Sequence, residues 1–316
     1  MAEPETGGSE SWERGVLERL VRSVLDEQRR TRRWGILFKS LGFLYLFIVL
    51  FLALGWLGGK EKAPGRHTAL VEVNGVISAD GQASAERVNA GLQDAFKDSK
   101  TAGVILRVNS PGGSPVQAGQ INSEMRRLRT LYPKIPLYVV VEDICASGGY
   151  YVAVAADRIY VDPASIVGSI GVLMDGFGFT GTMEKLGVER RLLTAGENKG
   201  FLDPFSPLNA KQRDYAEKML GEVHRQFIDV VRRGRGKRLK ETPELFSGLV
   251  WTGQKSVELG LADAVGSVTY VAREVIKAED IVDFTPRENL VERFARRFGA
   301  ATAEALVRMT ASPGLR

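Results

Sequence analysis

An uncharged run of twenty residues, Ser40 to Gly59, constrains this chain more than any other feature of its sequence. An α-helix rises ~1.5 Å per residue, so the run spans ~30 Å, the thickness of the hydrocarbon core of a bilayer. Trp34, Tyr45 and Trp56 lie toward its ends or flanks, where aromatic rings favour the membrane interface. We therefore expect one transmembrane helix over residues 36–59.

A signal peptide and a buried core helix both fit the apolar run less well than a membrane span. A secretory signal peptide would have a shorter apolar core nearer the N-terminus, followed by a cleavage site of small residues. A helix buried in the core of a protein seldom tolerates such all-round apolarity. The sequence therefore favours a membrane anchor.

The basic residues that flank the run are unevenly divided and indicate its orientation. More precede the run (Arg22, Arg29, Arg30, Arg32, Arg33, Lys39) than follow it (Lys60, Lys62, Arg66). Because basic residues stay on the cytoplasmic side, residues 1–34 should form a cytoplasmic segment. We place the helix in the inner (cytoplasmic) membrane and the bulk of the chain in the periplasm.

The chain is poor in residues that bind metals or form disulfides. Its 316 residues include two histidines, His67 and His224, and one cysteine, Cys145. A single cysteine excludes an intramolecular disulfide, and we expect it to be a small buried hydrophobic residue. No spacing of histidine, cysteine and carboxylates is typical of a metal site, so neither a metal nor another cofactor is predicted. The net charge of +5 is too small to indicate nucleic-acid binding.

After a linker over residues 60–68, short β-branched runs alternate with helical stretches. The expected strands are 69–77, 103–108, 137–141, 158–161, 169–173 and 188–193, and the expected helices are 83–97, 115–131, 148–156, 180–186, 209–233, 253–259 and 268–277. Strands that are apolar along their whole length are buried on both faces, and their alternation with helices indicates an α/β fold with largely parallel strands. We expect one domain over residues 69–280 and a tail over residues 281–316.

Ser147 is the strongest candidate for a nucleophile. It stands between an apolar strand that ends near Val141 and a helix that begins just after it. A hydroxyl there lies beside the unpaired amides and the positive dipole end of the helix, which would stabilise negative charge during attack on a carbonyl. The alternative is that Ser147 only caps the helix, as serine commonly does.

A second turn, from Arg107 to Pro115, also follows a strand and precedes a helix. Its Pro-Gly-Gly sequence places free amides in a concave backbone turn, which would supply the other half of an oxyanion hole. A plain tight turn is the alternative. Both turns lie at the C-terminal ends of predicted parallel strands, where α/β folds bind ligands.

A serine nucleophile needs a group that takes its proton. His67 falls in the predicted linker and His224 in the middle of a helix, where we expect it to be a solvated surface residue. Lysine remains, and although its ordinary pKa is ~10.4, burial without a carboxylate partner lowers that value by several units. Lys199, close to Phe201 and Phe205 in the sequence, fits this requirement but is one lysine among many.

Four motifs, taken in order, resemble the signal peptide peptidase A (SppA) family in its short form, including SohB-like members. They are Asn-Ser-Pro-Gly-Gly (109–113), Ala-Ser-Gly-Gly-Tyr-Tyr (146–151), Gly-Ser-Ile-Gly-Val (168–172) and Glu-Asn-Lys-x3-Asp-Pro-Phe (197–205). The resemblance covers roughly residues 70–278. It implies a Clp-protease/crotonase-like fold, a spiral of ββα units, and the activity of a Ser–Lys peptidase.

Residue by residue, the resemblance implies Ser147 as the nucleophile and Lys199 as the general base. Gly113 and Gly148 match the backbone donors of the oxyanion hole, and Ser169 matches the hydroxyl that orients the lysine amine. Family members assemble into dome-like rings, and in the short form the serine and lysine of one site can come from neighbouring subunits. A homo-oligomeric ring is therefore expected.

The resulting hypothesis is a membrane-anchored serine endopeptidase that degrades short hydrophobic peptides, such as cleaved signal peptides. Its expected partners are these peptides, membrane lipid and further copies of the chain, without nucleic acid. Two alternatives stay open: a catalytically silent membrane scaffold that binds peptides or proteins, and a crotonase-like acyl-CoA enzyme with the same fold and oxyanion geometry.

Two basic segments fall outside the motifs. The first, over residues 232–240, is expected to be a solvated helix end whose charges complement the helix dipole, with contact to anionic lipid as the second choice. The second is a basic amphipathic helix over residues 290–308. It would lie on the membrane, pack in a ring or stay mobile, and the sequence does not choose among these.

Overall fold

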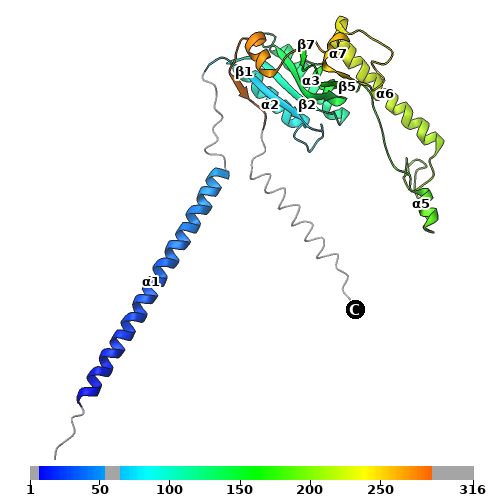
Figure 1. The fold of residues 1–316 in the computed structure, drawn as a ribbon. Coiled ribbons are helices and arrows are strands. Elements are labelled where there is room, and N and C mark those ends of the chain that lie inside the picture. Colours follow the sequence, from blue (N-terminus) through cyan, green and yellow to red (C-terminus); the bar gives the residue numbers. More distant parts are fainter. Residues whose placement is uncertain (1–6, 54–64, 287–316) are drawn as a thin grey trace, which may run out of the picture. The chain divides into compact units, whose positions relative to one another are not determined.

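The structure, a computed structural model, describes residues 7–53 and 65–286 (Figure 1). These residues belong to two units: an N-terminal helix, and a domain that comprises all the described residues from 65 onward. The amphipathic helix predicted over residues 290–308 lies outside the described residues.

Helix α1 (Gly7–Ala53) is continuous over 47 residues and contains most of the predicted transmembrane segment. Its stretch Glu27–Phe51 is long and apolar enough to cross a membrane: 18 consecutive residues within it have a mean hydropathy of 2.0, and none of these is buried within the structure. Residues 54–59, the end of the predicted segment, lie outside the described residues. By length and composition, α1 is thus a candidate membrane span.

The domain is built on a sheet of eight strands in which every pairing is parallel except that of β5 with β6. The main path is β6-β5-β3-β2-β1-β8, while β4 pairs with β3 and β7 with β4. The strands are β1 (His67–Asn74), β2 (Thr101–Ser110), β3 (Leu137–Ala146), β4 (Arg158–Val161), β5 (Ile166–Gly168), β6 (Val250–Thr252), β7 (Ala264–Val265) and β8 (Ile281–Asp283).

Strand β3 changes neighbours along its length, which directs its C-terminal end toward β5. Residues 138–140 pair with β4, whereas residues 144–146 pair with β5. Between these two stretches Glu142 and Asp143 are exposed, and the pairing of β2 with β3 shifts register between Val108 and Ser110. The C-terminal ends of β2, β3 and β5 therefore meet at one edge of the sheet.

Several helices bury apolar side chains against this sheet. Along α2, Val88, Leu92 and Phe96 are buried at a spacing of four residues, the period of one helix face. The helices are α2 (Ala85–Lys97), α3 (Pro115–Leu131), α4 (Gly148–Ala153), α5 (Thr180–Lys185), α6 (Ala210–Arg235), α7 (Gly253–Glu258) and α8 (Val268–Tyr270), with a 3₁₀ turn at Gly236–Arg238 and a π-helix at Val271–Ile276. This mixed α/β architecture confirms the predicted Clp-protease/crotonase-like fold class.

Two sequence-based boundaries and two predicted strands need correction. Strand β1 begins at His67, inside the predicted linker, and β8 pairs with β1 just beyond the predicted domain end at residue 280. The predicted strands 169–173 and 188–193 are absent from the described sheet. Apolar, β-branched residues suit a strand, but a strand also needs a neighbour to pair with, and these two segments have none in the described domain.

The residues between β5 and α6 form a projecting segment that we call the arm, residues 172–208. It contains α5, which lies at the far end of α6 from the sheet (Figure 1). Large apolar side chains on the arm are exposed, including Leu193 at 95%, Leu173 at 80% and Phe177 at 80%. In one copy of the described domain, the arm therefore carries apolar surface that nothing covers.

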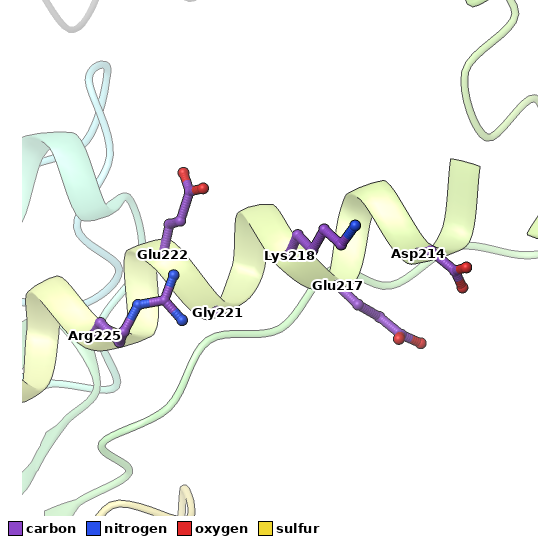
Figure 2. Close-up of a pocket in the computed structure, with 6 residues that line it drawn as sticks. All are labelled: Asp214, Glu217, Lys218, Gly221, Glu222 and Arg225. Carbon is purple, nitrogen blue, oxygen red and sulfur yellow. The ribbon is translucent and has the colours of Figure 1, made fainter. Parts of the chain in front are cut away.

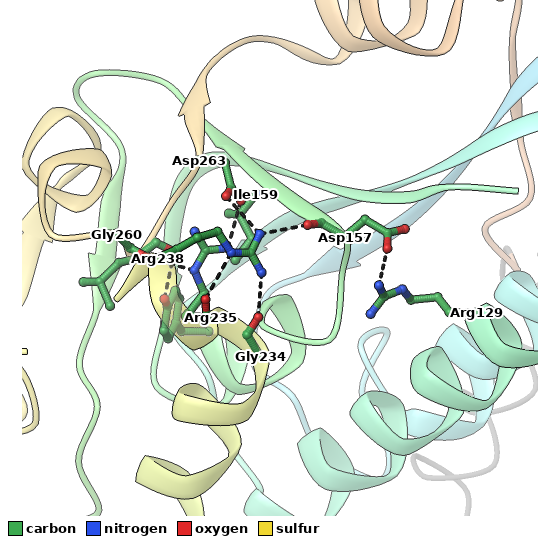
Figure 3. A network of polar contacts seen from close by, with 10 residues as sticks. Arg129, Asp157, Ile159, Gly234, Arg235, Arg238, Gly260 and Asp263 are labelled. Atoms are coloured by element: carbon green, nitrogen blue, oxygen red, sulfur yellow. Dashed lines mark hydrogen bonds and ion pairs between the residues drawn. The ribbon is translucent and has the colours of Figure 1, made fainter. Parts of the chain in front are cut away.

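The other end of α6 is held in the domain by buried charges (Figure 3). The Arg235 guanidinium, 1% exposed, lies 2.8 Å from Asp263 and donates to the carbonyl of Gly260 at 2.8 Å. Arg238 pairs with the second oxygen of Asp263 at 3.0 Å. The prediction of a solvated basic helix end is therefore wrong for Arg235, because a carboxylate distant in the sequence draws its guanidinium inward, whereas Arg238 stays exposed.

Candidate active site

Ser147 occupies the sharp turn between β3 and α4. Its backbone has φ 51° and ψ −122°, a region that side-chain-bearing residues rarely adopt and that costs ~1–3 kcal/mol. Its amide donates to the carbonyl of Gly168 at 2.8 Å, which holds the turn against β5. The half-buried Ser147 side chain makes no capping hydrogen bond to α4, so the alternative of a plain helix cap does not describe it.

The Gly112–Gly113 turn after β2 packs directly on the Ser147 turn. At Gly112 (φ 101°), an added Cβ atom would lie 2.6 Å from the amide nitrogen of Gly148 and 2.7 Å from the Ser147 Cβ atom. At Gly113 (φ 142°), it would lie 2.2 Å from the carbonyl oxygen of Ile77. Only glycine permits this close approach of the two turns.

The amides of Gly113 and Gly148 lie together beside Ser147. A Cβ atom on Gly148 would be 3.2 Å from the Gly113 nitrogen. Hydrogen bonds from Ile77 to the Gly112 carbonyl and from Ser114 to the Ile77 carbonyl, both 2.8 Å, fix the turn. No hydrogen bond within residues 65–286 uses the amide of Gly113 or Gly148 as a donor. Two free donors next to a hydroxyl are the arrangement that stabilises an oxyanion.

A narrow pocket of about 40 Å³ opens beside this hydroxyl and is mostly apolar. One side comes from the two glycine turns and α3, and another from Gly171 and Val172 after β5. Helix α6 supplies the remaining wall with Val223, Gln226 and Phe227. This wall was not predicted from the sequence, although the amphipathic period of α6, with Phe227 and Val231 on one face, indicates that this helix packs on the domain.

An open groove on the outer side of α6 has a different character (Figure 2). Its lining is Asp214, Glu217, Lys218, Gly221, Glu222 and Arg225, with no serine or cysteine. Although this groove is far more spacious, at about 510 Å³, it holds no nucleophile and no pair of free amides. The chemistry therefore belongs to the smaller pocket at Ser147.

Ser169 lies one residue after the end of β5 and is half-buried. Like Ser147 it has φ 51°, and its amide donates to the carbonyl of Leu249 at 2.8 Å. The hydrogen bond from the Ser147 amide to Gly168 places the two serine turns next to each other in the fold. The structure thus brings together four of the five predicted site residues: Gly113, Ser147, Gly148 and Ser169.

Lys199 is the exception. It is exposed, on the arm, three residues from Leu202, whose amide donates to the Gln212 side chain at 3.1 Å. Gln212 is separated from Val223, in the pocket wall, by roughly three turns of α6, or ~17 Å along the helix. Within one chain the structure does not bring Lys199 to Ser147.

Both histidines differ from expectation. His67 is buried at the start of β1, 1% exposed, at the opposite end of the strands from Ser147. His224 is half-buried rather than solvated, and its Nε2 atom lies 3.1 Å from the carbonyl oxygen of Ile170. The contact of His224 was not foreseeable from the sequence, since Ile170 is remote along the chain.

Cys145 and Tyr150 bracket Ser147 in the sequence but point into the core. Both are 0% exposed, and burial raises the pKa of the Cys145 thiol and of the Tyr150 hydroxyl well above their usual ranges. The Tyr150 hydroxyl donates to the carbonyl of Leu261 at 2.8 Å. Cys145 is therefore a small buried hydrophobic residue, as predicted, and Ser147 carries the accessible hydroxyl of this turn.

The fold is of the Clp-protease-like class, and the site sets a hydroxyl beside two free backbone amides. The model of peptidase family S49 matches residues 129–282. A protein of Enterococcus faecium named signal peptide peptidase SppA is 30% identical over 234 residues, which are 72% of this chain and 67% of that protein. The chain belongs to peptidase family S49.

Other relatives share the peptidase region within longer chains. Protease 4 of Haemophilus influenzae is 33% identical over 222 residues, 68% of this chain and 35% of that protein. A Brucella abortus protein named Na(+)/H(+) antiporter NhaA is 45% identical over 183 residues, 58% of this chain. That match spans 25% of the Brucella protein, so the similarity concerns only part of it.

Proposed function

We propose that this member of family S49 is a membrane-anchored serine endopeptidase in which Ser147 is the nucleophile and Lys199 the general base. The observation that carries the proposal is the strained, uncapped Ser147 turn packed against the free amides of Gly113 and Gly148. Backbone strain held at one serine, with an anion-stabilising pair beside it, is typical of a catalytic turn.

The geometry supports the following reaction. The Ser147 hydroxyl oxygen attacks the scissile carbonyl carbon while its proton passes to the uncharged amine of Lys199. The amides of Gly113 and Gly148 donate to the oxyanion that forms. The carbon–nitrogen bond then breaks, the protonated lysine returns the proton to the leaving amine, and water hydrolyses the acyl–serine ester by the reverse use of the same groups. The Ser169 hydroxyl would orient the lysine amine.

Lys199 would reach this site from a neighbouring copy of the chain. Its exposed position on the arm, away from Ser147 of its own chain, supports this arrangement. So does the uncovered apolar surface of the arm, with Leu193 and Phe177 among its exposed side chains, because docking against another copy would remove it from water. Assembly into a closed ring would give every Ser147 a lysine.

The proposed substrates are short hydrophobic peptides, such as cleaved signal peptides. The mostly apolar lining of the Ser147 pocket supports this class. Helix α1 would anchor the chain in the inner membrane with residues 1–34 in the cytoplasm, so that the peptidase domain lies in the periplasm beside the bilayer. Peptides left in the membrane by secretion would then be within its reach.

The test uses the full chain, purified as its oligomer in detergent, and a fluorogenic peptide with a signal-peptide sequence. Ser147→Ala and Lys199→Ala should each abolish cleavage without lowering the melting temperature. Lys185→Ala, which changes another exposed lysine of the arm, is the matched control and should retain activity. Near-normal cleavage by Lys199→Ala would show that the base is a different group.

Labelling separates an enzyme from a binding protein. A small fluorophosphonate reacts with an activated serine, so it should label wild-type Ser147 and leave Ser147→Ala unlabelled. Absence of labelling in the assembled wild-type protein would instead support a catalytically silent scaffold.

A further inference from the structure

His224 links two walls of the Ser147 pocket. Its Nε2 atom lies 3.1 Å from the carbonyl oxygen of Ile170, and the imidazole is half-buried. His224 follows Val223 on α6, in the pocket wall, while Ile170 directly precedes Gly171 and Val172, which line the facing wall. One side-chain hydrogen bond therefore ties one wall to the other.

The remaining hydrogen bonds of the segment after β5 run in other directions. The Gly168 carbonyl accepts from Ser147, and the Ser169 amide donates to Leu249. The Gly171 amide turns back to the Ser169 carbonyl at 2.9 Å. Within residues 65–286, no other hydrogen bond connects residues 168–172 to α6. The imidazole therefore holds the distance between this segment and α6, which no backbone hydrogen bond holds.

The partner of the imidazole defines its chemical form. A backbone carbonyl has no proton to give, so the hydrogen must be on Nε2 of His224. The contact therefore needs a donor at this position and not an aromatic ring as such. A glutamine amide can also donate at the end of a side chain of similar reach, whereas phenylalanine keeps the ring without the donor.

We propose that His224 is a positioning residue that sets the width of the Ser147 pocket and thereby the size of substrate side chain that the peptidase accepts. The proposal deepens the proposed function and rests on Ser147 as the nucleophile. His224 acts through Ile170 and does not touch the reacting atoms. Its loss should change which side chain enters the pocket and leave the reactivity of the hydroxyl unchanged.

The experiment measures covalent labelling of Ser147 in the full-length oligomer by two peptidyl diphenyl phosphonates. These differ only in the side chain that enters the pocket, alanine in one and leucine in the other. A small fluorophosphonate without such a side chain reports the intrinsic reactivity of Ser147. Wild type is compared with His224→Phe, His224→Gln and the control Glu222→Gln, whose side chain lies on the outer face of α6 (Figure 2).

In His224→Phe, the alanine-to-leucine ratio of labelling rates should change by about 3- to 10-fold, the effect of one neutral hydrogen bond. The fluorophosphonate rate should stay within about twofold of wild type, since the oxyanion donors are untouched. His224→Gln should restore the wild-type ratio, and Glu222→Gln should not alter it. His224→Leu serves as a second donorless variant if the phenylalanine variant fails to fold.

Two results would overturn the proposal. An unchanged ratio in a folded donorless variant would show that the hydrogen bond does not set the pocket width. Equal changes in His224→Gln and His224→Phe would show that a donor at this position is not sufficient to set the pocket width. Absence of labelling by every probe in the wild type would instead reject Ser147 as the nucleophile, and with it both proposals.

Discussion

A Cβ atom added to Gly148 would lie 3.2 Å from the amide nitrogen of Gly113, although the two glycines come from different strand ends. This contact puts two free backbone donors beside Ser147, and it also makes the arrangement sensitive to a single methyl group. The closest contact of that methyl would be with a donor and not with a core side chain.

Gly148→Ala should therefore impair activity without unfolding the protein. The methyl group would intrude where the oxyanion is bound, and loss of one such donor costs about 10²–10³-fold in kcat. Stability should hold or rise by up to ~1 kcal/mol, because alanine is favoured over glycine in a helix. Peptidase kinetics and thermal unfolding measure the two effects. Gly119→Ala, where nothing lies within 4 Å, is the control and should keep full activity.

Two inactive variants should rescue one another if Lys199 serves the Ser147 of a neighbouring copy. Equal amounts of Ser147→Ala and Lys199→Ala chains, coexpressed and assembled at random, would give about one quarter of sites with both groups intact. Activity near that fraction of wild type is expected in the purified mixture. An inactive mixture that still forms mixed oligomers would place the serine and its base in the same chain.

Charge on the arm should disrupt assembly while leaving the fold intact. Leu193 is 95% exposed in the single chain, so Leu193→Glu costs the domain little. If another copy covers this side chain, a buried unpaired carboxylate would oppose association. Light scattering should then show smaller particles, with activity lost in parallel. Leu131→Glu alters a 57%-exposed leucine at the end of α3 and should leave the oligomer unchanged.

The buried pair that holds α6 should give stability that depends on pH. Burial alone raises the pKa of Asp263, but its hydrogen bond with Arg235, the charge of Arg235 and the Ile159 amide outweigh burial and lower it. A carboxylate whose pKa is lowered on folding stabilises the fold fully at pH values above its pKa in the unfolded state, ~3.9. This contribution disappears as the pH falls through its pKa in the folded state.

Asp263→Asn should test this linkage. It leaves the guanidinium of Arg235 buried without its counter-charge, so it should cost ~3–5 kcal/mol near neutral pH. The melting temperatures of wild type and variant should approach one another as the pH is lowered from 5 toward 2. Parallel curves over that range would show that Asp263 does not supply the acid-side loss of stability.

Gly234→Ala should displace the end of α6. An added Cβ atom would lie 2.2 Å from the carbonyl oxygen of Val154, a backbone atom that cannot rotate away. We expect a loss of ~1–3 kcal/mol in stability, together with lower activity because α6 carries a pocket wall. Gly221→Ala, on the open outer face of the same helix, should be neutral or slightly stabilising (Figure 2).

Local patterns predicted most of the elements. The helix over residues 115–131 and the strand over residues 158–161 match the structure at both ends, because an apolar period and a proline or glycine boundary report on neighbours within a few residues. The prediction of a strand over residues 169–173 was wrong because local patterns do not report on distant partners. The composition of this segment suits a strand, but pairing depends on a partner that is distant in the sequence.

The sequence by itself determined the apolar run, the first four strands, the main helices, and the glycine and serine turns at the strand ends. These depend on side-chain chemistry and on neighbours along the chain. Only the tertiary structure decided that Gly113 meets Gly148, that α6 closes the pocket, and that His224 reaches Ile170. It also set Lys199 apart from Ser147 in a single chain. Such contacts are fixed by strand pairing and helix packing, whose energies come from residues far apart in the sequence.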